Sequence, residues 1–337
     1  MSSKLSIGIV GLPNVGKSTL FKVITKQSVV IANYPFATID PNVGVVSVPD
    51  ERLDKLAVLS NSKQIIPAVV EFYDIAGLVK GANQGEGLGN QFLSHIREVR
   101  AVVQVVRCFV DHDIVHVEEG VNPLRDIEII NTELILKDLE TIEKRMQKLE
   151  GEARTGDKEK VKDFETATFV RDGLRRNILA RNIEGGVVDE LIISELNLLT
   201  AKPQIYLFNG EEEDVPDELK KYVQGLNAGY LVVNVALADD IHELIKKAYE
   251  VLGLISFLTT GEDETRAWTI TRGMKAPQAA GVIHTDFEHK FIRAETIAWD
   301  KLLEAGGWSE AKQKGWLRLE GKEYVMQDGD VVEIRHG

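Results

Sequence analysis

The stretch GLPNVGKS, residues 11–18, constrains the fold of this 337-residue chain more than any other feature. It fits the template G-x-x-x-x-G-K-[ST], in which backbone N–H groups surround the phosphates of a nucleotide. The apolar run LSIGIVG precedes it and the helix-like stretch KSTLFKVITK follows it, as that geometry requires. Further apolar runs alternate with helical stretches along the N-terminal third. We therefore expect an α/β P-loop domain with a parallel-rich sheet.

The residue types of this motif suit phosphate chemistry. Lys17 would neutralise the β- and γ-phosphate oxygens, which makes it a candidate catalytic residue, and Ser18 would ligate Mg²⁺. Asn14 is in addition a candidate ligand for a monovalent cation such as K⁺. Backbone N–H groups would cradle the phosphates, so the candidate nucleotide-binding residues here are Asn14, Val15, Gly16, Lys17, Ser18 and Thr19.

A second phosphate element follows at DIAG, where a strand-like run ends. Asp74 would hold Mg²⁺ through water, and the N–H of Gly77 would sense the γ-phosphate. Between the two motifs, NYPFATID (33–40) stands where a switch loop belongs, and its Thr38 could ligate Mg²⁺. This order predicts a triphosphatase whose loops become ordered around the γ-phosphate and are released on hydrolysis.

The residue after DIAG departs from the common hydrolysis scheme. Leu78 stands where a water-orienting Gln is usual, and leucine cannot hold water by hydrogen bonding. Hydrolysis therefore needs another polar group. His116, in DHDIVHVEEG, is the first candidate and His112 the second, with a solvated loop residue as the alternative for either.

FNGEEED (208–214) occupies the place where this fold reads the base. A guanine reader has N-K-x-D, but here only Asn209 is kept, Gly210 replaces Lys, and Glu212 replaces Asp. The extra methylene moves the Glu212 carboxylate by ~1.5 Å, which spoils a bidentate fit to guanine. An unmatched buried polar group costs ~1–3 kcal/mol. We therefore predict that adenine is preferred, with its N6 amine engaged by Asn209 or Glu212.

Other candidates are Phe36, in the expected switch loop, and the second base loop VALADD (235–240), with tentative base contacts Ala236 and Leu237. The remaining acids of FNGEEED fit an ordinary surface turn.

The texture of the chain changes twice. A seam of apolar residues spaced 4, 3, 4, 3 predicts a coiled-coil-like helical hairpin, with a second helix reaching to about residue 199. The seam residues are Ile135, Leu139, Ile142, Met146 and Leu149. After residue 254, short strand-like pieces surround one helical stretch, which predicts an α+β module. The expected order is a P-loop domain in two parts, 1–126 and 200–254, interrupted by the helical insertion 127–199 and followed by the module 255–337.

Composition narrows the classes of partner. A net charge of −13 disfavours wholesale electrostatic binding of nucleic acid, and no sequence-specific DNA binding is expected. The single cysteine, Cys108, excludes an internal disulfide and stands in an apolar run, so a buried thiol is expected. No apolar run reaches the ~20 residues of a membrane span, and the N-terminus lacks a signal layout. We expect a cytoplasmic protein without a membrane partner.

Several strings together resemble the Obg-like ATPases, the YchF group: GLPNVGKSTLF, NYPFATI, DIAGLVKGA, GEGLGNQFL and RAWTI…KAPQAAGVIHTDFEHKFIRAE. The resemblance runs over nearly the whole chain. It implies a Ras-like P-loop domain, a helical coiled-coil insertion, and a C-terminal TGS domain of ubiquitin-like β-grasp fold. It also implies a catalytic histidine at His116, hydrolysis of ATP in preference to GTP, and association with the ribosome, where the large subunit is the expected contact.

Two features depart from the expected pattern. The second base loop lacks the Ser-Ala start that is common in the wider superfamily, and its join to the C-terminal module is shorter than is usual in the family. Three functions remain open: a ribosome-associated ATPase switch regulating translation or a stress response, a GTPase of translation or ribosome assembly, and a nucleotide-gated scaffold with negligible turnover.

Overall fold

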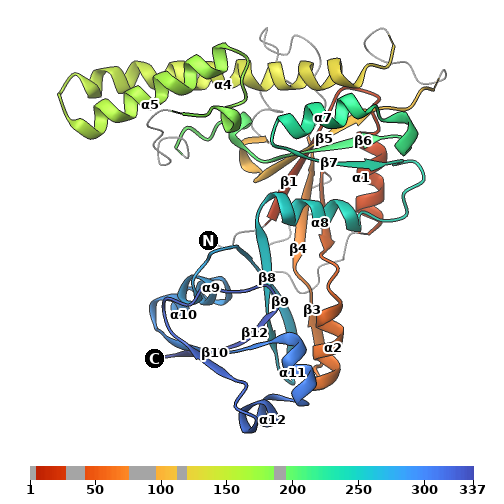
Figure 1. Cartoon of the computed structure of the whole chain (residues 1–337), viewed down its shortest axis with the longest axis vertical. Helices are drawn as coiled ribbons and strands as arrows, with labels where there is room; N and C mark the ends of the chain where they lie inside the picture. The colour runs from red at the N-terminus through yellow and green to blue at the C-terminus, as the bar shows by residue number, and fades with distance from the viewer. Residues whose placement is uncertain (1–4, 28–41, 76–95, 112–119, 186–194) are drawn as a thin grey trace.

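A computed structural model describes residues 5–27, 42–75, 96–111, 120–185 and 195–337. Within these ranges the strands form two six-stranded sheets, one in the upper domain of Figure 1 and one largely in the lower domain. A long helical hairpin extends sideways from the upper domain. No helix in the described ranges has the length and hydropathy to cross a membrane.

The first sheet has the order β2-β4-β1-β5-β6-β7. All neighbouring pairs are parallel except β2 with β4. Strands β1, β5 and β6 are buried at every residue, which explains their largely apolar sequences. The predicted α/β P-loop domain is therefore confirmed. Its elements are β1 (Leu5–Val10), α1 (Lys17–Lys26), β2 (Val43–Ser47), β4 (Val69–Asp74), β5 (Ala101–Arg107), β6 (Gln204–Asn209), α7 (Asp217–Gly225), β7 (Gly229–Val233) and α8 (His242–Val251).

The helical insertion is an antiparallel hairpin of α4 (Pro123–Ala153) and α5 (Lys158–Arg175). The side chains of Asn122 and Asp157 accept hydrogen bonds from backbone N–H groups of the first turns. Four residues of the predicted seam, Ile135, Ile142, Met146 and Leu149, are buried against α5. The hairpin is thus confirmed, but α5 ends well before residue 199. Asn177 takes a left-handed backbone (φ 60°), which stops the helix.

The second sheet has the order β11-β10-β12-β8-β9-β3, with β12 parallel to β8 in the middle. Its five C-terminal strands have the order of a ubiquitin-like β-grasp, as predicted, and α9 packs on them. The elements are β8 (Leu254–Thr260), β9 (Glu264–Thr271), α9 (Ala276–Ile283), α10 (Thr285–His289), β10 (Phe291–Ala298), α11 (Trp299–Ala305), α12 (Trp308–Gln313), β11 (Arg318–Glu320) and β12 (Asp330–His336).

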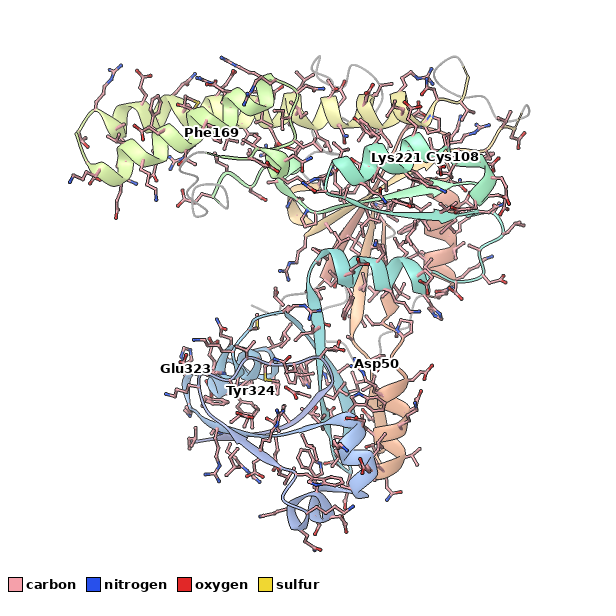
Figure 2. The ribbon with its side chains drawn as sticks, viewed as in Figure 1. Asp50, Cys108, Phe169, Lys221, Glu323 and Tyr324 are labelled. Carbon is pink, nitrogen blue, oxygen red and sulfur yellow. The ribbon has the colours of Figure 1, made fainter. Side chains whose placement is uncertain are left out.

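The sixth strand of this sheet comes from the N-terminal third of the chain. β3 (Gln64–Ile66) pairs with β9, and α2 (Glu51–Ser60) packs into the core of the C-terminal domain through Leu53 and Leu56. Arg52 donates to Asp328 at 2.8 Å. Figure 2 shows Asp50 where the chain enters α2, at the level where the two domains meet. The segment between β2 and β4 therefore leaves the P-loop domain and is built into the C-terminal domain.

Candidate nucleotide site

A cavity of about 480 Å³ lies where β1, β5, β6 and β7 end. The carboxyl ends of parallel strands are the usual ligand-binding edge of such a sheet. The loops after these strands, the first turn of α1 and the last residue of β6 supply the lining residues, which are Asn14, Gly16, Lys17, Ser18, Thr19, Phe109, Asp111, Asn209, Asn234 and Ala236.

The P-loop brings the first turn of α1 to this cavity. Gly16 directly precedes the helix with φ 105°, a conformation that favours glycine. A Cβ at this position would also overlap the side-chain amide of Asn209. The free N–H groups and positive dipole end of α1 favour an anion there, so the backbone is suited to phosphate.

Lys17 is buried at the bottom of the loop, with 9% of its surface exposed. Its Nζ donates to the carbonyl oxygens of Gly11 (2.9 Å) and Leu12 (2.7 Å). Burial lowers the pKa of Lys17 to about 8, against the opposing effect of Asp74. Burial likewise raises the pKa of the Asp74 carboxyl, while Lys17 lowers it. The Lys17 amine, which suits phosphate oxygens, and the Asp74 carboxylate at the end of β4, which suits a hydrated cation, therefore interact electrostatically.

Asn209 connects two loops of the site. It is 5% exposed; its Nδ2 donates to the carbonyl oxygen of Val15 (2.9 Å), and its Oδ1 accepts from the N–H of Val235 (3.1 Å). The side chain therefore ties the P-loop to the loop after β7. This contact accounts for a polar side chain at the end of a fully buried strand.

Gly210 and Glu212 of FNGEEED do not line the cavity. The Glu212 carboxylate pairs with Lys220, and the Glu212 side chain is 66% exposed. A Cβ on Gly210 would lie 3.1 Å from Oδ2 of Asp214, so a lysine here would require Asp214 to move. In the second base loop, Leu237 is 73% exposed.

The structure brings together Asn14, Gly16, Lys17, Ser18, Thr19, Asn209 and Ala236 around the cavity. It does not place Val15, Asp74, Gly210, Glu212 or Leu237 in the lining. The remaining candidates, Phe36, Thr38, Gly77, His112 and His116, lie outside the described residues, as does Leu78, which replaces the usual glutamine.

The sequence analysis did not predict two lining residues that follow β5, Phe109 and Asp111. Arg107 is 1% exposed and donates to the carbonyl oxygens of Phe109 (3.2 Å) and Asp111 (3.0 Å). Its guanidinium also lies 4.5 Å from the Phe109 ring centroid. The position of Phe109 and Asp111, directly after the strand that neighbours the P-loop strand, was the sequence feature that could have indicated them.

A third missed lining residue is Asn234, in the turn after β7. Its Nδ2 donates to Oε1 of Glu211 (2.7 Å), and its Oδ1 accepts from the N–H of Ala236 (3.2 Å). Glu211 therefore touches the site through Asn234. A single Asn after a strand carries no motif that would have revealed this pair.

Cys108 lies behind the base loop, in the P-loop domain (Figure 2), and is buried as predicted. Burial raises the pKa of its thiol to about 12, and Asp214 and Asp126 add to the effect. The thiol is therefore protonated at neutral pH and serves packing.

Comparisons with known proteins agree with this geometry. A family model described as a 50S ribosome-binding GTPase matches residues 6–149, and a model of the YchF GTPase C-terminal domain, described as a protein of unknown function, matches residues 254–337. The ribosome-binding ATPase YchF of Bacillus subtilis (strain 168) is 48% identical over 98% of this chain and 99% of its own. The protein of the same name from Escherichia coli O157:H7 is 43% identical over 97% and 98%.

A solved structure, that of the Schizosaccharomyces pombe YchF GTPase, is 39% identical, covers 98% of each chain and superposes with a TM-score of 0.85. The alignment with the Bacillus protein spans 361 positions, more than the 337 residues of this chain. The Bacillus protein therefore has residues that have no counterpart in this chain. At this identity and coverage, the chain belongs to the YchF family.

Proposed function

We propose that the chain is a Mg²⁺-dependent nucleoside triphosphatase of the switch type that prefers ATP to GTP and associates with the ribosome in the cytoplasm. The observation that carries the proposal is the convergence of Lys17, Ser18 and the first turn of α1 on one cavity, with Asp74 close enough to perturb Lys17. This arrangement suits a triphosphate and leaves the chemistry to positioning and charge neutralisation.

The donor set fits Mg²⁺. A serine hydroxyl and a strand-end carboxylate are hard oxygen donors, and Mg²⁺ retains waters and takes further oxygens from phosphates. Ser18 would bind the ion directly and Asp74 through water, with Thr38 joining when the γ-phosphate is present. The bound ion would neutralise charge on the β- and γ-phosphate oxygens. Asn14, which has a left-handed backbone (φ 61°) and lines the cavity, is the candidate for K⁺.

Because Leu78 replaces the glutamine that usually orients the attacking water, hydrolysis would rely on other residues of this chain. Lys17 would stabilise charge on the phosphates, the N–H of Gly77 would hold the γ-phosphate, and His116 would orient the attacking water. His112 is the alternative to His116.

Two observations support ATP over GTP. The base loop lacks both the Lys and the Asp of a guanine reader, and a side chain at Gly210 would require Asp214 to shift. The Bacillus and Escherichia relatives are named ATPases. The second candidate is a GTPase, because the Schizosaccharomyces relative is described as one.

The covalent connection to the C-terminal domain supports a switch. The segment 48–68 lies in the chain between the expected switch loop and Asp74, and its α2 and β3 belong to the C-terminal domain. A change of backbone conformation at the expected switch loop or at Asp74 would therefore be transmitted to the C-terminal domain. The relatives' names and the 50S description of the family model support the ribosome, and its large subunit, as the partner. The acidic charge of the chain favours contact through small basic patches or ribosomal protein.

Turnover and ribosome binding should be measured together. We expect Mg²⁺-dependent ATP hydrolysis that falls sharply in His116→Ala while ATP binding holds. His112→Ala is measured in parallel, and a sharp fall there with native turnover in His116→Ala would assign the role to His112. We also expect co-sedimentation with the large subunit to differ between ADP and a non-hydrolysable ATP analogue. Turnover that is negligible and unaffected by His116→Ala would instead favour the nucleotide-gated scaffold.

A further inference from the structure

The loops after β6 and β7 are joined by a side-chain pair at the nucleotide cavity. The two strands are parallel neighbours, with Asn209 opposite Val233, so their loops begin at the same level of the sheet. Glu211 follows the first strand and Asn234 the second. Their hydrogen bond, 2.7 Å from Nδ2 to Oε1, places a carboxylate behind an amide that lines the cavity.

The two partners of Asn234 fix the orientation of its amide. A carboxylate can only accept a hydrogen bond, so the amide atom facing Glu211 is the nitrogen. The N–H of Ala236 can only donate, so the atom facing it is the oxygen. Rotating the amide by 180° would lose both bonds, because the amide oxygen would face the Glu211 carboxylate and the amide nitrogen would face the N–H of Ala236. The amide therefore presents one defined pattern, a spare N–H on Nδ2 and a spare lone pair on Oδ1.

Glu211 is itself held in place. Its backbone N–H donates to Oδ2 of Asp214 (2.9 Å), and its backbone carbonyl accepts from the N–H of Asp214 (3.0 Å). Glu212, by contrast, is turned outward to Lys220. Of the acids in FNGEEED, Glu211 is thus the one connected to the cavity.

At the purine edge that carries N7, a fixed donor beside a fixed acceptor matches adenine and not guanine. Adenine offers its N6 amine as donor next to a ring nitrogen as acceptor, and an Asn amide can bond both at once. On the edge that carries N7, guanine offers two acceptors, O6 and N7, so the Asn234 oxygen would face O6 without a hydrogen between them. We propose that Asn234 reads the adenine base and that Glu211 is the positioning residue that fixes its amide. The inference rests on the proposed binding of a nucleotide at this site.

Base analogues test the assignment. Dissociation constants should be measured with Mg²⁺ for ATP, for purine riboside triphosphate, which lacks the N6 amine, and for inorganic tripolyphosphate. In the native chain, loss of the amine should weaken binding about tenfold, the value of one hydrogen bond. In Asn234→Ala, which loses both bonds to the base, ATP should bind about a hundredfold more weakly and the difference between ATP and the analogue should disappear. Tripolyphosphate should bind equally in both, which shows that the site is folded.

The positioning role has its own readout. Glu211→Gln can both donate and accept, so it should let the Asn234 amide rotate and reduce the ratio of GTP to ATP dissociation constants without changing tripolyphosphate binding. Glu213→Gln, an exposed neighbour, is the matched control and should keep the native ratio.

The outcomes separate the two proposals. If neither ATP nor tripolyphosphate binds the native chain, the proposed nucleotide function fails. If both bind but the analogue difference persists in Asn234→Ala, or disappears in Glu212→Ala instead, the assignment to Asn234 is overturned while the nucleotide function stands. A Glu211→Gln variant with the native ratio overturns the positioning role.

Discussion

Replacing Asn209 by alanine tests whether this side chain reads the base or holds the site together. The amide makes two buried hydrogen bonds, to the carbonyl of Val15 and from the N–H of Val235. At ~1 kcal/mol net for each bond, the P-loop loses about 2 kcal/mol of support. If the bound triphosphate must restore the loop, the dissociation constant rises about thirtyfold.

The loss should be the same for ATP and GTP analogues, because neither bond involves the base. Calorimetric titration of Asn209→Ala with non-hydrolysable ATP and GTP analogues measures this directly. Glu213→Ala, at an exposed position of the same loop, is the control and should bind as the native chain does. A loss confined to one of the two nucleotides, or no loss at all, would refute a structural role for Asn209.

Three further predictions concern buried polar groups. Since the Lys17 pKa is lowered from 10.5 to about 8, its charge destabilises the unliganded fold below pH 8, and this cost is relieved between pH 8 and 10.5. Lys17→Met should therefore raise the melting temperature at pH 7, by less at pH 9.5, and abolish triphosphate binding; an unchanged melting temperature would contradict the burial argument. The Cys108 thiol should react with a thiol reagent at pH 8 far more slowly in the native than in the unfolded protein, and equal rates would disprove its burial. Asp138, 1% exposed, accepts from the N–H groups of Leu199 and Thr200, so Asp138→Ala should speed hydrogen exchange at 199–200 yet leave ATP affinity unchanged, and native protection there would count against this anchor.

Local patterns carried much of the fold. The P-loop motif required a strand before it and a helix after it, and the buried strands were readable as apolar runs. The seam at Ile142 and Met146 predicted a helical hairpin because helix periodicity is a property of neighbouring residues.

Contacts between distant segments were not readable. Lys63 pairs with Asp263, 200 residues away, and no local pattern marks β3 as a strand of the C-terminal sheet. For the same reason FNGEEED indicated a base loop but not which carboxylate serves it. Asn234, the partner of Glu211, follows a different strand. The orientation of the Glu212 side chain depends on Lys220 in α7.

We propose that this altered base loop belongs to an ATP-preferring site. Isothermal titration of the native chain with ATP, ADP, GTP and GDP in the presence of Mg²⁺ tests this preference. ATP should bind more tightly than GTP and ADP more tightly than GDP, by about the ten- to hundredfold that an unmatched buried polar group produces. Clearly tighter binding of GTP and GDP would contradict it.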